Sequence, residues 1–326
     1  MLYYLLANCF SALSNNICKY VTLYSDSLSG QKPLTIILHT DILNLFLFSF
    51  IYFYHKSKGK VDFTLKETFC TKQEVIQVLL FSIPVFASSY KLLLMEKIQL
   101  SSLEISAMIK PFLVCVFATF LLKEKFRLYY IWYGLIICCG FLISNYNKIS
   151  TDHIYWLLSF IIIASIGDTT RRYYCRKMKN ALQGWCVEFF IFFLYGFVIL
   201  LVCPFLNYLF PSIFPNLGKY EFSFEILFNP FTWLISFITL SHHLSAIYGV
   251  KRASSVTSLE FINFSKVIFT LIFSYLLLGQ APYSSKVSIL GFEFNFYNQI
   301  FGAIIIAITL AFFTFRVNID RLKKND

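Results

Sequence analysis

The chain has 326 residues, of which 58% are hydrophobic and only 14% are charged. Soluble domains carry about 25% charged residues, so this composition excludes an ordinary soluble enzyme. A net charge of +11 would favour a nucleic-acid partner in a soluble protein, but here the basic residues lie in short loops between apolar runs, which is typical of membrane topology.

Ten apolar runs follow one another along the chain. Each has about 20 residues, the length at which a helix crosses ~30 Å of hydrocarbon. They predict an all-α polytopic membrane protein with ten transmembrane helices and no cleaved signal peptide, because the first run continues past Asn15 to Lys19. The predicted spans are residues 2–23, 34–54, 76–96, 101–122, 128–146, 153–174, 182–203, 228–249, 255–278 and 297–316.

The basic residues between the spans predict the orientation. With the N-terminus in the cytosol, nineteen Lys and Arg residues lie in cytosolic segments and five lie in the opposite loops. Basic residues accumulate on the cytosolic side of membrane proteins. We therefore expect both termini in the cytosol.

The two halves of the chain share a short sequence pattern. Ser102, Leu103, Glu104 and Lys110 recur 156 residues later as Ser258, Leu259, Glu260 and Lys266. Each half of the chain holds five predicted spans. Because five is an odd number, the second half enters the membrane from the side opposite to the first. This predicts two inverted five-helix repeats, at residues 1–150 and 151–326, of the kind from which many secondary transporters are built.

Lys110 and Lys266 lie near the centres of their predicted spans. A charge at the centre of a spanning helix costs ~2.5–3.5 kcal/mol, so neither ammonium group is expected to face lipid. One interpretation is structural pairing with Glu104 and Glu260, across helices because six residues separate the partners. The other is a phosphate-binding site where the two lysines meet between the halves. In that interpretation Pro111, directly after Lys110, permits a bend beside the site.

Other polar residues admit two interpretations each. Asp168 and Arg171, near the end of the sixth span, form either a basic membrane anchor or a rim that attracts anions. Tyr90, beside Lys91, either packs in the core or stacks on a base. The cysteines read as small core residues, and no metal site, cofactor motif or catalytic arrangement is found, so we expect no enzyme. Further charges within the predicted spans are Asp41, Lys91 and Glu188.

The C-terminal sequence indicates a compartment. Lys323 and Lys324 stand at the third and fourth positions from the last residue. A dilysine of this kind on a cytosolic tail returns membrane proteins to the endoplasmic reticulum. We therefore expect the membrane of the endoplasmic reticulum, with the Golgi membrane as the alternative.

Several stretches resemble nucleotide-sugar transporters of the drug/metabolite transporter superfamily, above all the branch related to the UDP-galactose transporter of the endoplasmic reticulum. The similar stretches are Ile109-Lys110-Pro111, residues 121–126, residues 167–174, and Lys266 with its neighbours. The sequence departs from that branch in an insertion at 283–296, before the last span.

The resemblance implies a ten-span inverted-repeat fold. It also implies that a cytosolic nucleotide sugar, such as UDP-galactose or UDP-glucose, is exchanged for a lumenal nucleoside monophosphate, with Lys110 and Lys266 on the phosphates. Alternatives are a carrier of ATP/ADP, a phosphorylated sugar or S-adenosylmethionine, and, in another class, a membrane enzyme or scaffold. The expected partners are a small anionic substrate and the lipid bilayer, without nucleic acid; a homodimer is compatible with the sequence.

Overall fold

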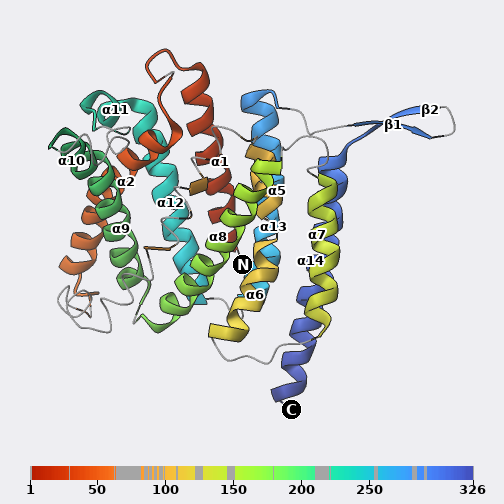
Figure 1. Cartoon of the computed structure of the whole chain (residues 1–326). Coiled ribbons are helices and arrows are strands. Elements are labelled where there is room, and N and C mark those ends of the chain that lie inside the picture. Colours follow the sequence, from red (N-terminus) through yellow and green to blue (C-terminus); the bar gives the residue numbers. More distant parts are fainter. Residues whose placement is uncertain are drawn as a thin grey trace.

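The computed structural model consists of helices and one short β-hairpin (Figure 1). It describes residues 2–28, 30–61, 63, 82–83, 87, 90–91, 94, 98, 100–107, 109–121, 128–144, 151–178, 180–209, 220, 222–252, 256–280, 285–289 and 292–325. The elements are α1 (Leu2–Tyr24), α2 (Pro33–Ser57), α5 (Leu100–Ala107), α6 (Lys110–Leu121), α7 (Tyr129–Ser144), α8 (Thr151–Lys177), α9 (Ala181–Phe197), the π-helix η1 (Val198–Val202), α10 (Cys203–Leu209), α11 (Phe224–Phe228), α12 (Pro230–Arg252), α13 (Val256–Leu278), β1 (Ser285–Ile289), β2 (Phe292–Phe296) and α14 (Asn298–Asn325).

The apolar runs coincide with helices wherever the structure describes them. Within those residues, three helices are long and apolar enough to cross a bilayer: Pro33–Ser57, Ala181–Leu209 and Pro230–Arg252. Helical structure with membrane-spanning character is thus confirmed, whereas the number of ten spans and the inverted repeat stay predictions. The predicted span 76–96 falls largely outside the described residues.

Large apolar side chains cover the outer surface of the helices. Trp132 on α7, Tyr155 on α8 and Phe312 on α14 are each more than half exposed. Exposed surface of this kind is what lipid tails contact around a membrane protein. Cys138 and Cys139 are also exposed on α7, so the interpretation of the cysteines as core residues is wrong for this pair.

The helices pack in pairs around one large core. α1 lies against both α12 and α13, α2 lies against α9, α6 against α8, and α7 runs beside α14 (Figure 1). The α7–α14 pair is especially close, because a methyl group added to Gly302 would lie 2.4 Å from the carbonyl oxygen of Gly140. Small residues let helix backbones approach in this way in membranes.

The fourth predicted span is broken in two. α5 ends at Ala107 and α6 begins at Lys110. Pro111 has no amide hydrogen for the carbonyl of Ala107, and its ring crowds that carbonyl, so a continuous helix is disfavoured here. α13, which carries Lys266 and has Val267 in the position after it, is a single helix. The helix is thus interrupted beside Pro111, where a bend was expected, and the two proposed repeat copies differ in this interruption.

The helix continues past Pro204, although the predicted span ends at residue 203. The helix passes through η1 into α10, which ends at Leu209. In the π-turn, the amide of Cys203 donates to the carbonyl of Val198, five residues back. The carbonyl of Leu200, four residues before the proline, instead accepts from the amide of Phe222 at 3.2 Å. The wider turn thus accommodates the proline without leaving that carbonyl unpaired.

The insertion before the last span, which was expected to be a loop, contains a short antiparallel β-hairpin, and the other elements that the structure describes are helical as predicted. Its register runs from Ser285 opposite Phe296 to Ile289 opposite Phe292. Residues 292–296 read Phe-Glu-Phe-Asn-Phe, an alternation with the period of a strand. Figure 1 shows the hairpin at one end of α14 and the C-terminus at the other.

Candidate functional site

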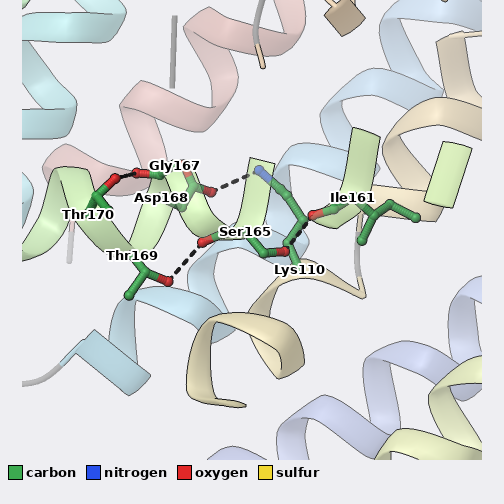
Figure 2. A network of polar contacts seen from close by, with 7 residues as sticks. All are labelled: Lys110, Ile161, Ser165, Gly167, Asp168, Thr169 and Thr170. Carbon is green, nitrogen blue, oxygen red and sulfur yellow. Dashed lines mark hydrogen bonds and ion pairs between the residues drawn. The ribbon is translucent and has the colours of Figure 1, made fainter. Parts of the chain in front are cut away.

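Lys110, the first residue of α6, forms an ion pair with Asp168 of α8. Its ammonium nitrogen lies 2.9 Å from Oδ2 of Asp168, and the two side chains are 22% and 25% exposed (Figure 2). The hydroxyl groups around Asp168 are committed to α8 itself: Ser165 donates to the carbonyl of Ile161, and Thr169 donates to that of Ser165. The pair therefore joins α8 to the break before α6.

Arg171, three residues after Asp168, lies inside the helix bundle. Its Nη2 is 2.6 Å from Oε1 of Glu188 on α9, and the side chains are 17% and 3% exposed. A surface anchor would be exposed, so that interpretation of Arg171 is wrong. The side chain of Arg172 is outside the described residues.

Glu188 also contacts a histidine of α12. Nδ1 of His243 lies 3.0 Å from the same carboxylate oxygen, and the rings of Phe189 and Phe192 pack against the imidazole at 5.7 and 4.8 Å. Water is kept from this group by these rings. Helices α8, α9 and α12 are thus joined by one buried carboxylate.

The second predicted lysine lies on the other side of this group. Lys266 of α13 interacts electrostatically with His242, whose Nδ1 is 2.8 Å from the carbonyl oxygen of Ala7. Beside Lys266, the hydroxyl of Ser265 accepts from the amide of Asn8 on α1 at 3.3 Å. The chain of polar contacts therefore continues from α12 to α1 and α13.

These contacts form one charged cluster. Arg171 interacts electrostatically with Asp168 as well as with Glu188, and His242 interacts with both Arg171 and Lys266. Counting only the side chains that the structure describes, three of its five charges are basic and two are acidic, an excess of one positive charge when the histidines are neutral. We call it the central cluster; its members are Lys110, Asp168, Arg171, Glu188, His242, His243 and Lys266.

The remaining predicted residues lie elsewhere or are not described in full. The ring of Tyr90 packs against Trp156 and Phe160, two turns or more from Asp168 along α8, and its stacking on a base stays a prediction. Lys91 is buried. The side chains of Glu104, Glu260, Lys323 and Lys324 lie outside the described residues, although the backbone of α14 is helical as far as Asn325.

Three members of the central cluster were not predicted as site residues. Glu188 stood out only as a charge within an apolar run, and the adjacent His242 and His243 match no ligand or catalytic spacing. The rarity of ionisable residues inside membrane helices was the available signal for Glu188. The partners of these residues come from distant segments, which spacing along the chain does not reveal.

Comparisons with known proteins bear on the fold alone. No family model and no curated protein matches the chain. Among solved structures, one described only as "Crystal structure of protein" aligns with a TM-score of 0.53 and 12% identity, covering 94% of this chain and 96% of that one. At this identity the match shows a shared arrangement of the chain over nearly its whole length.

Proposed function

We propose that this protein is a membrane carrier for a small phosphorylated anion, specifically a nucleotide sugar that it exchanges for a nucleoside monophosphate by alternating access. The observation that carries this proposal is the ion pair of Lys110 and Asp168 at a helix break, within a partly buried cluster whose described side chains have a net positive charge. Intramembrane ionisable residues mark substrate pathways in transporters, and broken helices line their binding sites.

The position of Lys110 suits a phosphate group. As the first residue of α6, it joins its own charge to the positive end of the helix dipole. A phosphate oxygen that reaches Lys110 must compete with the carboxylate of Asp168, because this carboxylate accepts a hydrogen bond from the same ammonium group. UMP carries a doubly charged phosphate and a nucleotide sugar carries two adjacent singly charged phosphates, so each presents more negative charge than a single carboxylate, which favours nucleotides over monocarboxylic acids.

Lys266 supplies a second basic group on a different helix. α13 contacts both α5 and α6, so the two lysine-bearing segments are neighbours in the bundle. A substrate with two phosphates, such as UDP-galactose or UDP-glucose, is the class that two such groups would hold. The resemblance of residues 109–111 and 167–174 to nucleotide-sugar transporters supports the same assignment, and the dilysine tail supports residence in the endoplasmic reticulum.

Transport in liposomes tests the proposal. Protein reconstituted in vesicles loaded with UMP should take up a labelled nucleotide sugar faster than in vesicles without UMP. Lys110→Ala should remove most of this uptake, whereas Lys56→Ala, at an exposed position near the end of α2, should leave it unchanged. The proposal is wrong if no nucleotide sugar is exchanged for UMP, or if Lys110→Ala and Lys56→Ala behave alike.

A panel of other solutes separates this function from the alternatives. ATP, ADP, a phosphorylated sugar and S-adenosylmethionine are each offered in excess over the labelled nucleotide sugar. The central cluster predicts that phosphorylated anions compete and that the cation S-adenosylmethionine does not. Competition by S-adenosylmethionine alone would indicate a different class of carrier.

A further inference from the structure

Asp41 is a buried carboxyl group outside the central cluster. It lies in the first half of α2 and is 3% exposed. Within the described residues it takes part in no hydrogen bond or ion pair. An isolated carboxylate in such surroundings is strongly disfavoured relative to the neutral acid.

The neighbours of Asp41 place it toward the inside of the bundle. Asn44, one turn along α2, accepts from the hydroxyl of Ser236 on α12 at 2.8 Å. Leu38, one turn before Asp41 on the same face of the helix, belongs to the large core. The side chain between them therefore faces helices rather than lipid.

Other buried polar atoms near this level of the bundle also lack partners. Nδ2 of Asn44 and Oγ1 of Thr232, one turn before Ser236 on α12, form no hydrogen bond within the described residues. Since buried polar groups are nearly always paired, such atoms mark a place where a small polar species or a change of conformation is expected. Asp41, Asn44 and Thr232 form what we call the α2–α12 polar group.

Among the residues that the structure describes, none forms an ion pair with Asp41. His39 on the same helix lies 2.7 Å from the carbonyl of Thr35, and its other ring nitrogen accepts from the amide of Ser223. Glu188 is held by Arg171 and His243. The π-helix η1 carries no titratable residue. The elements that pack against α2 carry these titratable groups: Cys186, Glu188 and Tyr195 of α9; His242, His243, Tyr248, Lys251 and Arg252 of α12; Tyr3, Tyr4, Cys9, Cys18, Lys19, Tyr20 and Tyr24 of α1; and Glu225 of α11.

We infer that Asp41 is a proton-binding site that couples proton movement to transport. In the conformation described here the carboxyl group is protonated; in a conformation that admits water to the α2–α12 polar group it releases the proton. Only an O–H bond forms and breaks, and the proton comes from and returns to water. This inference rests on the proposed transport function, which it extends by naming a second transported species.

A proton gradient across reconstituted vesicles tests this inference. If one proton accompanies each solute, a difference of one pH unit should change the accumulation ratio of the nucleotide sugar about tenfold. A pH-sensitive dye inside the vesicles should report proton movement that starts with UMP exchange. Asp41→Asn should still exchange, without dye response or gradient dependence. Asp26→Asn, an exposed control, should behave like the wild type.

Three outcomes separate the two proposals. Exchange that ignores the gradient in the wild type overturns the proton site and leaves the carrier function standing. Proton coupling that survives in Asp41→Asn overturns Asp41 as its origin.

If no nucleotide is exchanged, infrared spectroscopy decides: a protonated-carboxyl band at neutral pH must be present in the wild type and absent in Asp41→Asn. Asp41→Glu, which keeps an acid, should retain coupling and serves if the Asn variant does not fold.

Discussion

Two of the charged residues in this bundle are tolerated because each has a partner of opposite sign on another helix. Lys110 reaches Asp168 on α8, and Arg171 reaches Glu188 on α9. The first pair is about a quarter exposed, whereas the carboxylate of the second is almost fully buried. The first pair can therefore exchange partners at a lower cost in desolvation, and the second serves mainly to hold the helices.

Removal of Glu188 should destabilise the protein more than removal of an exposed carboxylate. Glu188→Ala leaves Arg171 buried without its partner, so the free energy of unfolding in detergent should fall by about 3–5 kcal/mol. Glu225→Ala, on the exposed surface of α11, should change it little. A double variant, Arg171→Met with Glu188→Leu, should recover most of the loss; no recovery would contradict the ion-pair explanation.

Removal of Asp168 should strengthen anion binding. Asp168→Asn removes the carboxylate that pairs with Lys110 and raises the positive excess of the described central cluster from one to two. We expect the dissociation constant for UMP to fall by about tenfold, or ~1.4 kcal/mol, in a thermal-shift titration. Weaker binding in Asp168→Asn would show that the carboxylate contributes to the bound state instead.

Part of the candidate site could be predicted at the level of single residues. Lys110 was identifiable because an uncompensated charge is improbable at the centre of an apolar run. Its partner was not, because Asp168 is 58 residues away and the sequence offered Glu104 closer by. The same limit applies to His243 and Glu188, which meet only when α9 and α12 pack.

At the scale of elements, the apolar runs predicted the helices well and the irregular segments poorly. α8 and α12 begin and end within three residues of the predicted limits. Pro204 was expected to end its helix, because a sequence does not show that a π-turn can accommodate the ring. The β-hairpin was missed because ten residues of alternating pattern were counted as a loop between two spans.

The close contact of α7 and α14 yields a prediction about helix packing. Gly302→Ala places a methyl group 2.4 Å from the carbonyl oxygen of Gly140 and 2.6 Å from Cβ of Ser144, so the helices must separate. We expect the free energy of unfolding to fall by about 1–3 kcal/mol. The control is Ile308→Ala on the lipid-facing side of α14, where the side chain is half exposed. Equal effects of the two variants would contradict tight packing at Gly302.

For the whole molecule, α2 and α12 run in the same direction. Ser27 and Asn229, just before the two helices, share a hydrogen bond of 2.9 Å, so the ends at Lys56 and Arg252 lie at the opposite end of the bundle. Tyr3 packs near Tyr248 and Arg252, which brings the start of α1 to that same end. This arrangement agrees with the excess of basic residues expected on one side of the membrane.

Labelling of single cysteines tests that orientation. In a background without the nine native cysteines, Lys56→Cys and Arg252→Cys should react with a membrane-impermeant maleimide only from the cytosolic side. Ser27→Cys should react only from the lumenal side. Reaction of all three from one side would mean that the predicted spans do not cross the bilayer.

The unequal shape of α5–α6 and α13 has a consequence for kinetics. Lys110 lies at the break between the two short helices α5 and α6, whereas Lys266 lies within the continuous helix α13. Under the proposed exchange, the two faces of the carrier then need not bind solute with equal strength, and half-saturation concentrations measured from the cytosolic and lumenal sides should differ. Microscopic reversibility still requires that this difference be balanced by the rates of reorientation, so the asymmetry alone accumulates nothing; direction comes from the gradients that drive the cycle.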